Sequence, residues 1–131
     1  MLLPDVALLR RQDEVVVIGT AIEAKVAGSG FRSIAGRLGV RAGTVRGWLR
    51  RFEERADLLR AYFTRWAVVL DPELGAVLPA GGTVADALEA VAVAVRAWVL
   101  RFGPGDPWRI ASVLSGGLLL ATRTTPLPAL S

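Results

Sequence analysis

Two long stretches of this 131-residue chain repeat their apolar residues at helical spacing. Intervals of four and three residues alternate from 45 to 66, and again from 84 to 102. This spacing gathers apolar side chains on one face of an α-helix, whereas a strand needs an interval of two. With no convincing strand pattern elsewhere, the sequence predicts an all-α fold. The two apolar seams are formed by Val45, Leu49, Phe52, Ala56, Leu59, Phe63 and Trp66, and by Val84, Leu88, Val91, Val95, Trp98 and Phe102.

Breaker and capping residues divide the chain into five predicted helices. Asp13 is expected to cap the first helix, and Gly39 to end the second. Asp86 follows Thr83 by three residues, as in a capping box, and Asp106-Pro107 suits the N-cap and first position of the last helix. The expected helices cover about residues 13–27, 31–38, 42–69, 83–102 and 108–122.

The composition removes several classes of chemistry. The chain has no cysteine and no histidine, which excludes disulfides, Cys/His metal sites, thiol nucleophiles and histidine-dependent triads. Hydrophobic residues make up 53% of the chain, enough to bury a core. The N-terminus lacks a signal-peptide pattern, and charged or short apolar stretches argue against a membrane span. We therefore expect a cytoplasmic protein without cofactors and with no membrane association.

The net charge of +4 is concentrated in one segment. Residues 28–66 carry nine arginines and three carboxylates, a net charge of +6, whereas residues 1–27 and 67–131 each carry a net charge of −1. A coding bias toward arginine would not by itself produce this clustering. A polyanion would bind favourably to such a segment, although a solvated helix face could also carry it.

Residues 29–52 combine a short predicted helix, a glycine turn and the start of a long helix. Ala35 lies where the two helices are expected to approach closely, and Gly39 suits the left-handed backbone of the turn. Val45 and Trp48 are expected to pack back onto the first helix. The apolar set of this segment is Ile34, Ala35, Leu38, Val40, Val45, Trp48 and Leu49.

This pattern resembles the helix-turn-helix of DNA-binding proteins, in the homeodomain-like form of transposases, invertases and many bacterial regulators. The resemblance implies that the second helix enters the major groove and that its first residues meet base edges. Arg41 departs from the pattern, which usually has Ser, Thr or Pro at this position. The residues expected to read bases are Arg41, Ala42, Gly43, Arg46, Gly47 and Arg50.

Six further polar residues are expected to contact phosphates, which would position the protein without reading sequence. They lie at the start of the first helix of the motif and along the second helix. They are Ser29, Arg32, Ser33, Thr44, Arg51 and Arg55.

Residues 2–11, 16–25 and 44–52 together are similar to an uncharacterised bacterial family of transposase-like helix-turn-helix proteins. A zinc ribbon precedes the corresponding part of that family, but this chain has no cysteine, so no metal role carries over. The similarity covers about residues 1–66. We therefore expect a helix-turn-helix domain over residues 1–66, with the motif at about 29–52, then a C-terminal helical region (67–124) and a tail (125–131).

The predicted function is binding of double-stranded DNA without catalysis, in transcription regulation or as a transposase-derived module at the nucleoid. Tyr62 lies next to an apolar seam and is interpreted as packing rather than as a nucleophile. The alternative is a helical protein–protein interaction module that does not touch DNA. The seams of 44–69 and 83–102 are expected to pack together as an antiparallel hairpin, or to leave one seam for a homodimer that reads two half-sites.

Overall fold

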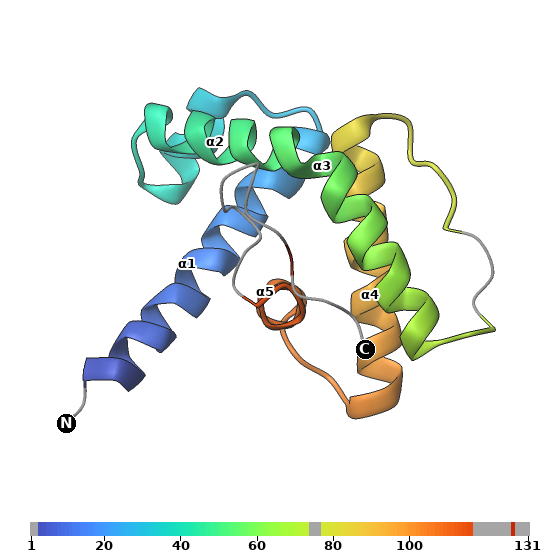
Figure 1. The fold of residues 1–131 in the computed structure, drawn as a ribbon. Coiled ribbons are helices and arrows are strands. Elements are labelled where there is room, and N and C mark those ends of the chain that lie inside the picture. The colour runs from blue at the N-terminus through green and yellow to red at the C-terminus, as the bar shows by residue number, and fades with distance from the viewer. Residues whose placement is uncertain (1–2, 74–76, 117–126, 128–131) are drawn as a thin grey trace. The chain divides into compact units, whose positions relative to one another are not determined.

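The computed structural model describes residues 3–73, 77–116 and 127, with side chains from residue 15 onward. These residues form five helices and no strand, which confirms the all-α prediction (Figure 1). Contacts divide the chain into an N-terminal unit (Met1–Leu49) and a C-terminal unit (Arg50–Ser131). The boundary between the two units falls inside the third helix. The helices are α1 (Leu3–Val26), α2 (Phe31–Leu38), α3 (Ala42–Leu70), α4 (Thr83–Phe102) and α5 (Pro107–Leu114).

Helices α2, α3 and α4 closely match the predicted ranges, but the first and last helices do not. Asp13 lies inside α1, which begins at Leu3, so it is not an N-cap. Pro4 does not prevent this earlier start, since proline is tolerated in the first turn of a helix. α5 ends at Leu114 because Gly116 turns the chain with a φ of 64°, and the predicted extension over 117–122 lies outside the described residues.

The N-terminal unit has its own hydrophobic core, formed where α1, α2 and the start of α3 meet. Ala21 of α1, Ile34 and Ala35 of α2, and Val45 of α3 are buried together. All seven apolar residues predicted for the motif belong to this core or pack against it, which confirms their predicted packing. The half-buried residues around it are Ala24, Phe31, Leu38, Val40, Ala42, Trp48 and Leu49.

In the C-terminal unit, α3 and α4 run in the same direction (Figure 1). Arg60 of α3 pairs with Asp86 near the start of α4, with 3.8 Å between Nη1 and Oδ2. Further along both helices, the Arg101 guanidinium donates a hydrogen bond to the Leu70 carbonyl at 3.4 Å. The predicted antiparallel hairpin is therefore wrong.

The length of the connection explains why this arrangement is feasible. Residues 71–82 separate the two helices. An extended chain covers up to about 3.3 Å per residue, so this segment can span about 40 Å. Returning along α4 from Arg101 to Thr83, eighteen residues, requires only about 27 Å. A tight turn would have imposed an antiparallel pair, but this connection does not.

The buried face of α4 is formed largely by alanine. Ala87, Ala90, Ala94 and Ala97 recur at helical spacing and are buried, as are Val91 and Val95 of the predicted seam. Phe102, also predicted for the seam, is 60% exposed, so that part of the prediction is wrong. Small side chains allow neighbouring backbones to come close, and this accounts for a buried face centred on alanine rather than on the larger residues.

The α3 seam follows the prediction closely. Phe52, Ala56, Leu59 and Phe63 are fully buried. This seam is therefore already covered within one chain, and a homodimer would need another surface. The predicted packing role of Tyr62 is confirmed, because its ring is buried and its hydroxyl donates a hydrogen bond to the Leu114 carbonyl of α5.

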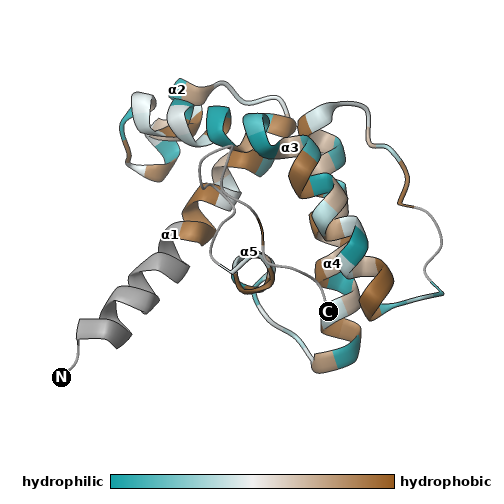
Figure 2. Ribbon diagram, viewed as in Figure 1, coloured by the Kyte–Doolittle hydropathy of each residue, from teal (hydrophilic) through white to brown (hydrophobic). Residues whose placement is uncertain are grey.

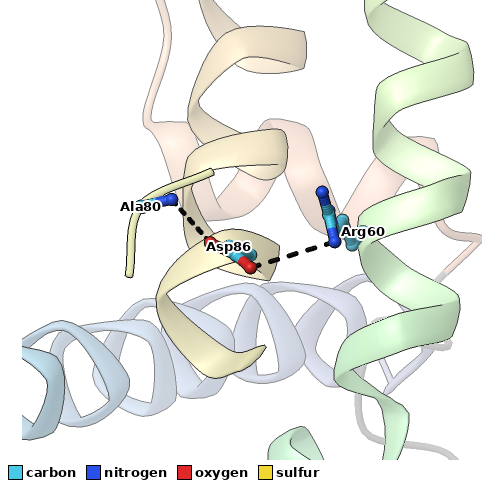
Figure 3. A network of polar contacts seen from close by, with 3 residues as sticks. All are labelled: Arg60, Ala80 and Asp86. Carbon is cyan, nitrogen blue, oxygen red and sulfur yellow. Dashed lines mark hydrogen bonds and ion pairs between the residues drawn. The ribbon is translucent and has the colours of Figure 1, made fainter. Parts of the chain in front are cut away.

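A side chain caps the start of α5, whereas α4 begins after Gly82 without a side-chain cap. The Asp106 carboxylate accepts hydrogen bonds from the backbone N–H groups of Trp108 and Arg109, as the predicted N-cap of α5. Asp86 does not form the predicted capping box, because its carboxylate accepts a hydrogen bond from the Ala80 N–H instead (Figure 3). None of the helices in the described part of the chain is long and apolar enough to cross a membrane.

Candidate nucleic-acid interface

The turn between α2 and α3 has the geometry that its glycine predicts. Gly39 adopts a left-handed conformation with a φ of 69°, and its N–H caps α2 on the Ala35 carbonyl. The Val40 N–H donates to the same carbonyl at 3.1 Å. A Cβ atom on Gly39 would meet nothing within 4 Å, so the backbone conformation, and not lack of space, favours glycine here.

α3 begins directly after Arg41, whose carbonyl accepts hydrogen bonds from the N–H groups of Thr44 and Val45. The Arg41 side chain is exposed at this helix start. Ala42 is half-buried and packs against the core, so less of it is available to a partner than the sequence interpretation implied. The Arg41 side chain is therefore accessible to a partner, whereas Ala42, its neighbour in sequence, is only partly accessible.

The remaining residues predicted to read bases lie in the first turns of α3, with both arginines facing solvent. Gly43, Arg46 and Arg50 are exposed, and Gly47 is half-buried. A Cβ atom on Gly43 or Gly47 would meet nothing within 4 Å. Each glycine costs a helix about 1 kcal/mol relative to alanine. Packing within the chain therefore gives no reason for glycine at either position.

The predicted phosphate contacts divide into accessible residues and one buried residue. Arg32, Ser33, Thr44 and Arg51 are exposed. Ser29 is half-buried, and its hydroxyl accepts a hydrogen bond from the Arg37 guanidinium at 2.9 Å. This bond links the start of the motif to the last turn of α2.

Arg55 does not fit the predicted phosphate contact, because only 1% of its surface is exposed. It follows Phe52 by three residues and precedes Leu59 by four, which places it on the buried face of α3. Burial also lowers the pKa of its guanidinium, since a charged group loses solvation there. Arg55 is therefore a residue of the buried face of α3 and not a phosphate contact.

Phe31 belongs to this surface although the sequence interpretation did not include it. It is the first residue of α2 and is half-buried against the core. The guanidinium carbon of Arg46 lies 5.7 Å from the centre of its ring, and that of Arg32 lies 5.9 Å away. The ring thus brings together one residue predicted to read bases and one predicted to contact phosphate. In the sequence, only the position of Phe31 directly before Arg32 indicated such a contact.

The segment from residue 24 to residue 52 carries charge of one sign. No aspartate or glutamate occurs between residues 24 and 52, whereas the same segment contains six arginines and one lysine. Figure 2 shows hydrophilic turns in α2 and along α3. Among the residues that the structure describes, no group of three or more carboxylates could hold a metal ion. This segment therefore offers cations without a carboxylate of its own, and Glu53 and Glu54 follow it directly on α3.

No protein-family model matches this chain, and neither a curated protein nor a solved structure matches it.

Proposed function

We propose that the protein binds double-stranded DNA, with the first turns of α3 in the major groove. The observation that carries this proposal is that Gly43, Arg46 and Arg50 are exposed in the first turns of α3, next to a left-handed glycine turn. A helix with glycines between its arginines can approach a groove closely. Arginine can form two hydrogen bonds with guanine, worth about 1–3 kcal/mol of discrimination.

Exposed cations on the adjoining elements fit contacts with the phosphate backbone. Arg32 at the start of α2 and Arg51 on α3 are exposed, and Arg41 lies between the two helices. Such contacts release counterions, so affinity depends steeply on salt. With these three contacts, a rise from 50 to 200 mM salt should weaken binding by about fortyfold.

Selection from random duplex DNA with the purified chain tests the proposal. We expect a preferred sequence, and we expect Arg46→Ala with Arg50→Ala to lose that preference together with at least about tenfold in affinity. The matched control is Arg65→Ala with Arg96→Ala, which removes two exposed arginines outside the motif. That control should retain the preference. No enriched sequence together with no salt-sensitive binding would rule the proposal out.

In the cell, this activity would suit a transcriptional regulator or a transposase-derived DNA-binding module at the nucleoid. The proposed role is binding, without a catalytic step and without a cofactor. A regulator should retain its sequence preference in the isolated chain, because α3 would carry the residues that read bases. The regulated genes would then follow from the selected sequence.

Exposed apolar residues favour a second candidate, a protein–protein interaction module. Val68 and Val69 lie near the end of α3, and Leu100 and Phe102 lie near the end of α4. Leu100 is 85% exposed. A partner held by these residues should bind with little salt dependence and should be unaffected by Arg46→Ala with Arg50→Ala. The same double variant therefore separates the two functions.

A further inference from the structure

Phe31 is half-buried, whereas the two arginines near its ring are exposed. One part of its ring packs against the core of the N-terminal unit, which fixes its position relative to α2 and α3. Arg32 and Arg46 are exposed, yet both guanidinium carbons lie within 6 Å of the ring centre. A ring anchored in a core thus extends to the surface where the two cations lie.

The physical consequence concerns the freedom of Arg46. An exposed arginine samples many rotamers, and ordering it on binding costs conformational entropy. A cation near the face of an aromatic ring is attracted by the ring quadrupole, even at an exposed site. The anchored ring therefore narrows the range of positions that the Arg46 guanidinium occupies before any partner arrives.

We infer that Phe31 is a positioning residue that orients Arg46 for its base contact and thereby sets how strongly the protein discriminates at that base pair. This inference rests on the proposed function. Two hydrogen bonds to guanine require a defined orientation of the planar guanidinium, so orientation should affect discrimination more than it affects overall attraction to DNA. Arg32, near the same ring, remains available for phosphate.

Three variants test the inference on the full chain. Phe31→Leu retains an apolar side chain but removes the ring, Phe31→Tyr retains the ring, and Arg46→Ala identifies the base pair that depends on Arg46. Each variant is titrated with the preferred duplex, with the same duplex changed at that base pair, and with an unrelated duplex. We expect Phe31→Leu to reduce discrimination at that base pair by about two- to fivefold and to leave affinity for the unrelated duplex nearly unchanged. Phe31→Tyr should restore wild-type discrimination.

A measurement without DNA checks the contact itself. Protons of the Arg46 side chain near the ring should resonate upfield in the NMR spectrum of the wild type and of Phe31→Tyr. In Phe31→Leu they should move to the values of an ordinary exposed arginine. Arg50, which is also exposed on α3, serves as the reference, and its signals should stay unchanged. Upfield signals that persist in Phe31→Leu would contradict the inference.

The outcomes separate this inference from the proposed function. If the wild type shows no salt-sensitive DNA binding, the proposed function fails and the positioning role fails with it. If the wild type binds with a sequence preference and folded Phe31→Leu discriminates equally well, only the inference is overturned. If Phe31→Leu does not fold, trifluorophenylalanine at position 31 replaces it, because fluorine weakens the quadrupole and largely retains the ring shape. Reduced discrimination in that protein supports the inference, and unchanged discrimination overturns it.

Discussion

Arg46 and Arg55 lie on the same helix, yet they occupy opposite environments. Arg46 is exposed in the N-terminal unit, beside the ring of Phe31. Arg55, about two and a half turns further along, is buried in the C-terminal unit. Nine residues correspond to 900° of helical rotation, so the two side chains leave α3 from opposite faces. Arginine content locates the charged segment, but the helix face decides which arginines can reach a partner.

Small residues show the same contrast between the two units. Gly43 and Gly47 lie in the first turns of α3, where an added Cβ atom would meet open space. Ala90 and Ala94 are fully buried on α4. In the C-terminal unit, small side chains thus serve packing within the chain. In the N-terminal unit they leave a thin outer surface, which is the feature that the proposed groove binding uses.

The largest expected effect compares Arg55 with its neighbour Arg51. Arg55→Ala should destabilise the protein by about 2–4 kcal/mol, because it removes a large buried side chain, as large-to-small core substitutions do. Arg51→Ala changes an exposed residue and should alter stability by less than about 0.5 kcal/mol. Urea unfolding of both variants measures the difference.

The same pair tests the division of roles on DNA. Arg51→Ala should lower the salt dependence of binding by about one phosphate contact. Arg55→Ala should leave it unchanged under conditions where the variant is folded. A loss of salt dependence in folded Arg55→Ala would mean that the buried arginine reaches DNA after all.

The glycines around the turn provide the second test. Gly39→Ala should destabilise the N-terminal unit by about 1–2 kcal/mol, because a left-handed backbone disfavours a side chain. Gly43→Ala and Gly47→Ala should each stabilise α3 by about 0.5–1 kcal/mol, since both glycines are helical and the added methyl group has space.

Affinity for DNA should change in the opposite direction at Gly43 and Gly47. An added methyl group on the groove-facing surface would hold α3 away from the base edges, so each stabilised variant should bind the preferred duplex more weakly. Thermal unfolding and duplex titration of the same samples measure both effects. Stabilised variants that bind as well as the wild type would show that this face does not approach DNA closely.

The turn at Gly39 illustrates what the sequence could predict. The glycine, the spacing of Ala35 and Val45 and the end of α2 are local features, and local features follow from backbone preferences and periodicity. The direction of α4 relative to α3 depends on which faces match and on how far the connection can reach. Periodicity does not report these, so the antiparallel expectation failed.

The same reasoning separates Arg55 and Phe31 from the residues that were predicted correctly. Arg55 was interpreted by its charge, although its spacing from Phe52 and Leu59 placed it on the apolar seam. Phe31 was absent from the predicted site because its importance depends on two arginines from different helices near one ring. Such a contact between elements is visible only once α2 and α3 are placed together.

The third prediction concerns the cap of α5, in the C-terminal unit. Asp106→Ala should destabilise that unit by about 1 kcal/mol, because the Trp108 and Arg109 N–H groups lose their acceptor at the helix start. Asp106→Ser should recover most of this loss, since serine also caps helices. Thermal unfolding measures the stability, and duplex titration should show unchanged affinity. If Asp106→Ala also weakened duplex binding by about 1 kcal/mol, the C-terminal unit would contribute to DNA binding.

The smallest effect on stability is expected at Asp86, whose carboxylate pairs with the Arg60 guanidinium within the chain. The hydrogen bond from the Ala80 N–H, together with the nearby Arg60, holds the pKa of the Asp86 carboxyl below its usual value (Figure 3). A lowered pKa stabilises the folded state above the unfolded value of about 4, and this contribution disappears as pH falls through the folded pKa.

Asp86→Asn should therefore lower the thermal midpoint slightly at pH 7, and the difference from the wild type should shrink below about pH 4. Glu89→Gln is the matched control, because it breaks the exposed pair with Arg96 and should have almost no effect. Unfolding scans of all three proteins between pH 7 and pH 3 measure the differences. A deficit in Asp86→Asn that stays constant to pH 3 would show that the carboxylate charge contributes nothing.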